Sequence, residues 1–292
     1  MQRASDDHQD AGAWREPSAR LSGGNWARAL VVVVAVGLGL SGVISPSDVK
    51  SSEETRNVLF VGDSNALSIY ASVKDDPGRG WRVSVATRFG CGVVPYTAVS
   101  NGVVLRPTQP LCREWASNRG SEIASQPADV AVLFVGGWEQ YDRWVAGRVV
   151  RYSEREWQLR TQRDYSQVLS EMRRSATKIA IVLNGCHSAP SLDLPVETLY
   201  QWGRYAPVIN DLNRIQATNQ AALEAARRAP FPVRVLDLHE FLCRDGYTET
   251  MKGVTLRTDG LHFSLDGSRI IWSWMKRAIE GRAARGSEPE RR

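Results

Sequence analysis

The sequence predicts an α/β protein, a doubly wound three-layer α/β/α sandwich around a mainly parallel five-stranded sheet, preceded by one transmembrane helix. Short runs rich in Val and Ile alternate along the chain with longer amphipathic stretches, and most of these runs contain no regular polar alternation. Such runs are typical of strands buried on both faces, as in a parallel sheet covered by helices. One stretch near the N-terminus carries no charge at all, and it predicts the membrane helix.

Strands and helices are expected in regular alternation. The expected strands are 57–62, 82–87, 130–136, 178–185 and 233–238. The expected helices are 65–74, about 113–125, 154–175, 209–229 and 267–280. The remaining segments 88–112 and 186–208 are expected to be long irregular connections, and loops that follow strands often carry binding function.

The overall composition is that of a globular protein. Of the 292 residues, 42% are apolar and 24% are charged, which excludes a fully disordered or collagen-like chain. The formal net charge of +5 is a mild bias over this length, and no dense run of Arg or Lys occurs. We therefore expect no nucleic-acid partner.

The uncharged stretch Ala29–Ser47 is 19 residues long. As a helix it would span roughly 28 Å, close to the thickness of the hydrocarbon core of a bilayer. A cleaved signal peptide is the alternative, but the preceding arm is long and no clear A-x-A site follows. No polar stripe marks a soluble buried helix. An uncleaved signal anchor is therefore favoured, with a weak excess of positive charge on its N-terminal side.

This anchor sets the expected domain organisation. We expect a disordered cytoplasmic arm at 1–28, the anchor at 29–47, a linker at 48–55, one domain at 56–280 and a flexible tail at 281–292. The protein would then be a single-pass protein of the cell membrane with its domain outside the cytoplasm.

The cysteines fit such a location. An even number of cysteines in a chain with an export segment suggests disulfides, and their spacing lacks the paired C-x-x-C pattern of a zinc site. We expect Cys91–Cys112 and Cys186–Cys243, although the sequence permits three connectivities and also four reduced, buried thiols. No metal site and no cofactor are expected.

The first candidate site motif is Gly62-Asp63-Ser64, directly after the first expected strand. In open parallel sheets, functional groups gather beyond the C-terminal ends of the strands. A Ser at a tight turn from strand to helix can expose its hydroxyl, and its N–H can face a developing oxyanion. The alternative is a simple helix cap, for which Ser and Asp are both common.

The second candidate motif is Asp259-Gly260-Leu261-His262, just before the last expected helix. A serine nucleophile needs a base that titrates near neutral pH, which His supplies. A carboxylate three residues away can orient the imidazole and stabilise its charged form. His187, one of the three other histidines, could line the site, but packing within its loop is favoured.

The two motifs resemble those of the SGNH (GDSL-like) hydrolases, which carry Gly-Asp-Ser near the start of the domain and Asp-x-x-His near its end. The resemblance covers about 56–280 and implies the SGNH hydrolase fold. It also implies that Ser64, His262 and Asp259 form a catalytic triad. Family members build an oxyanion hole from the N–H of the serine, a Gly after the second strand and an Asn in a third block. Here the Gly would be Gly90, or Gly92 as the alternative.

The third block departs from that pattern, because Trp138 stands where the family has Asn. Loss of one oxyanion donor can cost about 2.7–4 kcal/mol. The stretch GGWEQYDRW is similar to a segment of the SGNH domains attached to membrane acyltransferases of the acyltransferase-3 type, which O-acylate envelope glycans. Those domains also carry cysteines that match Cys91 and Cys112. Trp138 and Glu139 are possible substrate contacts, with a bracing role favoured for Glu139 and Arg143.

The resemblance implies a membrane-anchored, extracytoplasmic serine esterase or O-acyltransferase. Its substrates would be acyl esters, above all acetyl esters, of cell-envelope glycans or other acylated molecules, and a separate membrane acyltransferase is a possible partner. The alternative is a catalytically impaired protein of the same fold that serves as an anchored glycan-binding or scaffold module.

Overall fold

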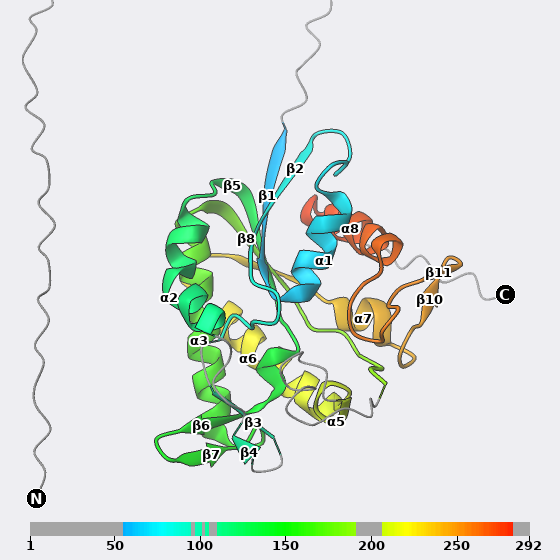
Figure 1. Cartoon of the computed structure of the whole chain (residues 1–292). Helices are drawn as coiled ribbons and strands as arrows, with labels where there is room; N and C mark the ends of the chain where they lie inside the picture. The colour runs from blue at the N-terminus through cyan, green and yellow to red at the C-terminus, as the bar shows by residue number, and fades with distance from the viewer. Residues whose placement is uncertain (1–54, 95–96, 101–102, 105–109, 191–205, 283–292) are drawn as a thin grey trace, which may run out of the picture. The chain divides into compact units, whose positions relative to one another are not determined.

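The computed structural model describes residues 55–94, 97–100, 103–104, 110–190 and 206–282. A parallel sheet stands at its centre, with strand order β2-β1-β5-β8-β9 (Figure 1). The strands are β1 (Arg56–Gly62), β2 (Trp81–Thr87), β5 (Ala128–Phe134), β8 (Ala176–Val182) and β9 (Val233–Leu236). All five predicted strands are therefore present and lie in one parallel sheet.

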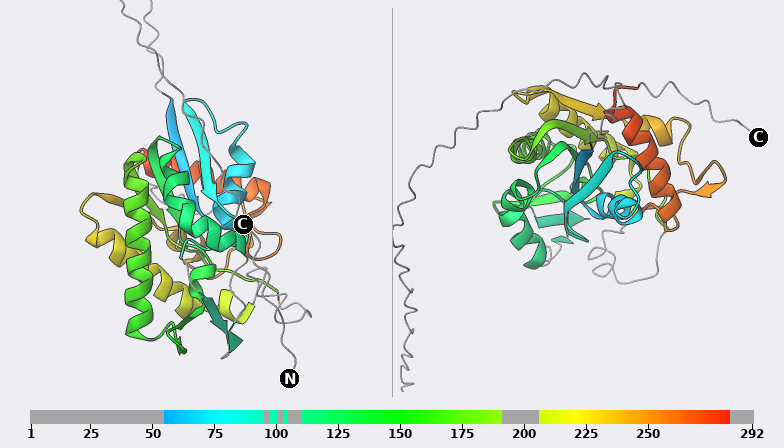
Figure 2. Two further views of the ribbon diagram at one scale, coloured as in Figure 1. Left: turned by 60° about the vertical axis from the view of Figure 1, so that its left-hand side comes forward. Right: turned by 90° about the horizontal axis from the view of Figure 1, so that it is seen from above.

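Helices cover both faces of this sheet (Figures 1 and 2). On one face lie α1 (Ser64–Val73), α7 (Leu238–Cys243) and α8 (Leu265–Ile279). On the other lie α2 (Pro110–Ala124), α3 (Arg155–Arg173) and α6 (Leu212–Arg228). Successive side chains of β1 pack against opposite helical layers. Phe60 packs in the cluster with α1 and α8, and Leu59 packs in the cluster with α2, α3 and α6. This two-sided burial is why the predicted strands lack polar alternation.

A second, antiparallel sheet lies beyond the C-terminal ends of the central strands, with strand order β4-β3-β6-β7 (Figure 1). Its strands are β3 (Thr97–Ser100), β4 (Val103–Val104), β6 (Asp142–Val145) and β7 (Arg148–Val150). The prediction of an irregular connection over 88–112 was therefore partly wrong. Strand β3 forms because it pairs with β6, about 45 residues away, and such distant pairing leaves little local signal.

The remaining described elements are short. The 3₁₀ helix η1 (Trp138–Gln140) follows β5, and α5 (Ala206–Ile209) precedes α6. A small hairpin of β10 (Thr250–Met251) and β11 (Val254–Thr255) leads to the segment that carries His262.

Both expected disulfides are present. Cys91–Cys112 joins the segment after β2 to the first turn of α2, and Cys186–Cys243 joins the segment after β8 to the end of α7. Each bond therefore fixes a connection that leaves the C-terminal end of a central strand.

The predicted anchor at 29–47 lies outside the described residues. So do the arm at 1–28, the linker up to residue 54 and the tail from residue 283. Within the part of the chain that the structure describes, no helix is both long enough and apolar enough to cross a membrane.

Candidate active site

Ser64 is the first residue of α1, at the point where β1 ends. The turn is tight: a Cβ on Gly62 would lie 2.9 Å from the Cβ of Phe134 and 3.2 Å from that of Ala66. Asp63 caps the helix, because its Oδ1 accepts a 2.9 Å hydrogen bond from the N–H of Asn65. Because Asp63 caps the helix, the hydroxyl of Ser64 can face the segment around His262. The N–H of Ser64 belongs to the N-terminal turn of α1.

Ser64, His262 and Asp259 lie in one hydrogen-bonded line. The Oγ of Ser64 is 2.9 Å from Nε2 of His262, and Nδ1 of the same ring is 2.8 Å from Oδ2 of Asp259. With Nδ1–H donating to the carboxylate, Nε2 of a neutral imidazole is an acceptor for the serine proton. This is the arrangement that nucleophile activation requires.

The Asp259 carboxylate is held by donors on both oxygens. Its Oδ1 accepts from the N–H of His262 at 2.7 Å and from the N–H of Leu261 at 2.9 Å. Burial raises the pKa of Asp259, but these hydrogen bonds and the His262 ring outweigh burial and hold the pKa well below its usual range. The carboxylate is therefore ionised at neutral pH.

Gly260 brings this segment against the connection after β8. Its φ is +70°, and a Cβ there would lie 2.0 Å from the carbonyl oxygen of Ser188. The N–H of Ser188 in turn donates to the carbonyl of Gly260 at 3.0 Å. Only glycine allows the two backbones to come this close.

His187 is buried in the same connection, away from solvent. Its Nε2 lies 3.0 Å from Oδ1 of Asn184. Burial, together with the nearby Arg257 and His262, holds the pKa of His187 well below the usual value. This neutral, buried ring fits the packing role favoured for it from the sequence.

The segment after β2 carries the candidate oxyanion glycines. Gly90 has a φ of +73°, which glycine adopts at little cost, and it directly precedes the disulfide-bonded Cys91. A Cβ on Gly92 would lie 2.4 Å from Oε1 of Glu139 and 2.7 Å from the Cβ of Trp138. Gly92 is thus required for packing against η1, and Gly90 for the turn itself.

The residues after β5 contact the turn that carries Ser64. The N–H of Gly137 donates to Oδ2 of Asp63 at 3.3 Å, which ties this segment to the serine turn. Trp138 is half-buried against the apolar cluster around α5, with its ring centroid 6.0 Å from that of Tyr141. The side chain of Glu139 is wholly buried, so it has the bracing position and no surface to offer a substrate.

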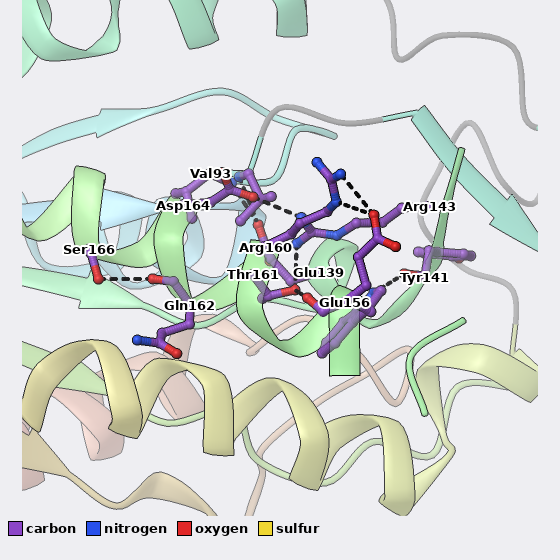
Figure 3. A network of polar contacts seen from close by, with 12 residues as sticks. Val93, Glu139, Tyr141, Arg143, Glu156, Arg160, Thr161, Gln162, Asp164 and Ser166 are labelled. Atoms are coloured by element: carbon purple, nitrogen blue, oxygen red, sulfur yellow. Dashed lines mark hydrogen bonds and ion pairs between the residues drawn. The ribbon is translucent and has the colours of Figure 1, made fainter. Parts of the chain in front are cut away.

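Arg143 is also a bracing residue (Figure 3). It is 2% exposed, and its guanidinium donates to Oδ2 of Asp164 at 2.8 Å and to Oγ1 of Thr161 at 2.6 Å. The cation also lies over the ring of Trp157, 5.4 Å from its centroid. These contacts fasten β6 of the small sheet to α3.

Phe89 is a site residue that no pattern in the sequence indicates. Its side chain is 53% exposed, and its ring is stacked with that of His262 at a centroid distance of 6.3 Å and an interplanar angle of 23°. A single exposed Phe is unremarkable in a sequence, because the signal lies in its proximity to a histidine 173 positions away. In the part of the chain that the structure describes, no group of His, Cys, Asp and Glu could hold a metal ion.

The chain is similar to several solved structures. One is the periplasmic domain of a lipopolysaccharide acetyltransferase of Salmonella ser. Paratyphi A, with 12% identity over 78% of this chain and 85% of that one, at a TM-score of 0.47. Another is the acetylxylan esterase Axe2 of Geobacillus stearothermophilus, with 15% identity over 78% and 96% of the two chains, at a TM-score of 0.40.

A third similar structure is the acetyl xylan esterase AlAXEase, with 16% identity over 76% and 99% of the two chains, at a TM-score of 0.44. No curated protein matches the chain. The family model described as the SGNH domain fused to AT3 domains matches residues 42–273, which is most of the chain. The chain belongs to this family of SGNH domains.

Proposed function

We propose that the protein is a membrane-anchored, extracytoplasmic serine esterase or O-acyltransferase. Its substrates would be acyl esters, chiefly acetyl esters, of cell-envelope glycans. The observation that carries the proposal is the placement of His262 between Ser64 and Asp259, within hydrogen-bond distance of both. Membership of a family whose SGNH domains are fused to AT3 domains supports acyl chemistry on glycans, with a membrane acyltransferase as a candidate partner.

The geometry supports acyl transfer in two steps. In the first, Nε2 of His262 accepts the hydroxyl proton while Oγ of Ser64 attacks the ester carbonyl carbon. The oxyanion of the tetrahedral intermediate would accept hydrogen bonds from the N–H groups of Ser64 and Gly90. The intermediate expels the alcohol, which takes the proton from His262, and an acyl ester on Ser64 remains.

In the second step Nε2 of His262 removes a proton from an incoming hydroxyl, whose oxygen attacks the carbonyl carbon of the acyl-serine. The bond between that carbon and Oγ of Ser64 breaks, Oγ takes the proton back from His262, and the acyl group leaves on the incoming oxygen. If the incoming hydroxyl belongs to water, the protein acts as an esterase. If it belongs to a sugar, the protein acts as a transferase. The difference depends on which hydroxyl the site admits. Asp259 remains ionised in both steps and stabilises the imidazolium that forms in each.

Two features support the extracytoplasmic location. The uncharged stretch Ala29–Ser47 is suited to a membrane anchor, and the two disulfides are typical of proteins in oxidising compartments. Together they support a domain held on the outer side of the cell membrane, within reach of envelope glycans.

The test is covalent labelling of Ser64 in the purified full-length protein. We expect a fluorophosphonate to label Ser64, identified by peptide mass spectrometry, and we expect hydrolysis of an aryl acetate. In Ser64→Ala labelling disappears and the rate falls by about 10³-fold or more. Equal rates in both proteins, with no label on Ser64, would contradict the enzyme proposal and favour the anchored glycan-binding alternative, to which Trp138 in the third block points.

The exposed ring of Phe89 predicts a substrate contact. Sugar rings stack on exposed aromatic faces, and burial of an aromatic face in such a contact favours binding. We expect Phe89→Ala to raise KM for an acetylated oligosaccharide about fivefold, with Phe89→Tyr close to wild type.

For a small alkyl acetate, which does not extend to the ring, the KM of the Phe89 variants should stay at the wild-type value. Leu159→Ala is the matched control, because Leu159 is an exposed apolar residue on α3 and is 43% exposed. A KM for the oligosaccharide that stays unchanged in Phe89→Ala would show that the ring does not contact the substrate.

A further inference from the structure

Glu139 is a fully buried carboxyl group that the acyl-transfer steps do not use. The charged group that acts on it most is another carboxyl, Asp63, and its Oε2 has no hydrogen-bond partner among the described residues. Burial of a carboxyl group without an opposite charge lowers the stability of the folded protein. The contacts that Glu139 makes indicate what its burial achieves.

On one side Glu139 holds the segment that carries the candidate oxyanion glycine (Figure 3). Its Oε1 accepts hydrogen bonds from the N–H of Val93 at 2.7 Å and from the N–H of Val94 at 3.3 Å. The carbonyl of Val93 accepts from the buried Arg119, which is paired with Glu171 at 2.7 Å. Val93 is thus held through both of its backbone polar groups, three positions after Gly90.

On its other side Glu139 approaches the serine turn across Gly136. A Cβ on Gly136 would lie 3.0 Å from Oε2 of Glu139 and 2.2 Å from Oδ2 of Asp63. Both carboxyl groups therefore border the same small space beside Gly136. Asp63 caps the helix of Ser64, so the two carboxyl groups together span from the serine turn to the Val93 segment.

We propose that Glu139 is a positioning residue, which sets Gly90 at the correct distance from Ser64 by accepting hydrogen bonds from Val93 and Val94. This inference rests on the proposed function, because it assigns the role of oxyanion donor to Gly90. Positioning of such a donor affects the transition state far more than the bound substrate. The signature of the role is therefore a change in kcat with little change in KM.

The ionisation state of Glu139 offers a second readout. Burial and the negative charge of Asp63 raise the pKa of Glu139 to about 7. Asp63 faces it from the α1 turn, and Arg119 with Glu171 lies beyond Val93, on α2 and α3. Titration of Glu139 changes the strength of its hydrogen bonds to the Val93 and Val94 amides, because bonds to an ionised acceptor are the stronger ones.

The kinetic test compares Glu139→Gln with Glu139→Ala on an aryl acetate. Glutamine keeps an acceptor oxygen for Val93 and Val94, so we expect kcat within about threefold of wild type. Alanine leaves both amides without an acceptor, so we expect kcat to fall about 10- to 100-fold while KM stays within about threefold. Unchanged kcat in Glu139→Ala, or an equal loss in both variants, would overturn the proposal.

Asp164→Asn is the matched control, since it removes a carboxylate that braces β6 through Arg143 and lies outside the site. It should lower the melting temperature and leave kcat unchanged. A fall in kcat equal to that of Glu139→Ala would overturn the proposal, because it would mean that any loosening of this region has the same effect.

An NMR titration tests the contact without catalysis. In wild-type protein the amide protons of Val93 and Val94 should shift with a midpoint near pH 7. In Glu139→Gln this transition should be absent, and its persistence would overturn the proposal. If Ser64→Ala proves as active as wild type, the proposed function fails, while the titration still reports whether Glu139 holds the Val93 segment.

Discussion

Replacement of Asp259 by Asn should reduce kcat by about 10⁴-fold while the fold stays intact. The reason is that both oxygens of the carboxylate accept hydrogen bonds from the turn and from the imidazole. Oδ1 receives the N–H groups of Leu261 and His262, and Oδ2 receives Nδ1–H of the imidazole. An asparagine must turn its NH₂ group toward one of these two sides.

Both orientations of that asparagine are unfavourable. With NH₂ toward the backbone, two hydrogen bonds that shape the turn are lost. With NH₂ toward the ring, Nδ1 becomes the acceptor and the proton moves to Nε2, which can then no longer accept a proton from Ser64.

The measurement is the steady-state hydrolysis of an aryl acetate beside thermal unfolding of the same sample. Asp237→Asn is a suitable control, because Asp237 also accepts a backbone N–H, from Glu240 at 2.8 Å, but caps α7 away from the site. A loss in Asp259→Asn of less than tenfold would be inconsistent with an orienting role for Asp259.

Gly260→Ala should both destabilise the protein and inactivate it. The left-handed backbone conformation at φ +70° costs an alanine roughly 1–2 kcal/mol. In addition its Cβ would lie 2.0 Å from the carbonyl oxygen of Ser188, a backbone atom that no rotamer change can remove. We expect a total loss of about 3 kcal/mol or more of unfolding free energy, because the Ser188 segment and the turn must move apart.

Such a movement would displace Asp259 and His262, which flank the glycine, so we expect kcat/KM to fall at least about 100-fold. Gly253→Ala is the matched control. Gly253 has a φ of +75° and nothing within 4 Å of a Cβ, so it separates the conformational cost from the clash. Denaturant unfolding should show a loss of roughly 1–2 kcal/mol for Gly253→Ala with activity unchanged. Equal losses in the two variants would contradict the role given to the Ser188 contact.

The sequence was sufficient for the central sheet because its strands carry a local signal. Segments such as VLFVG in β1 are apolar on both faces, and they read as buried parallel strands without knowledge of their partners. Each of the two site motifs is also a short continuous segment. Asp259 and His262 meet within one turn, and Ser64 follows closely after β1. The pairing of Ser64 with His262 across the domain came from resemblance to a family and not from any pattern of residues.

A bracing role for Glu139 was favoured from the sequence, but its partners were not identified, because its contacts join distant parts of the chain. Glu139 is buried because two amides 46 and 45 positions before it face its carboxylate, and a lone Glu in a sequence is ordinarily an exposed residue. The nearest sequence signal is the pair of glycines at 92 and 136, which make room for it. Strand β3 has only four residues, and it becomes a strand through its pairing with β6.

The pairing of β3 with β6 also limits how the region around the site can diverge or be redesigned. The two strands belong to different connections, one between β2 and α2 and the other between β5 and α3, and they share backbone hydrogen bonds in one register. A deletion of one residue in either strand would turn its side chains to the opposite face of the small sheet. Changes in one connection must therefore remain compatible with the other. A graft intended to change the substrate must transfer both together.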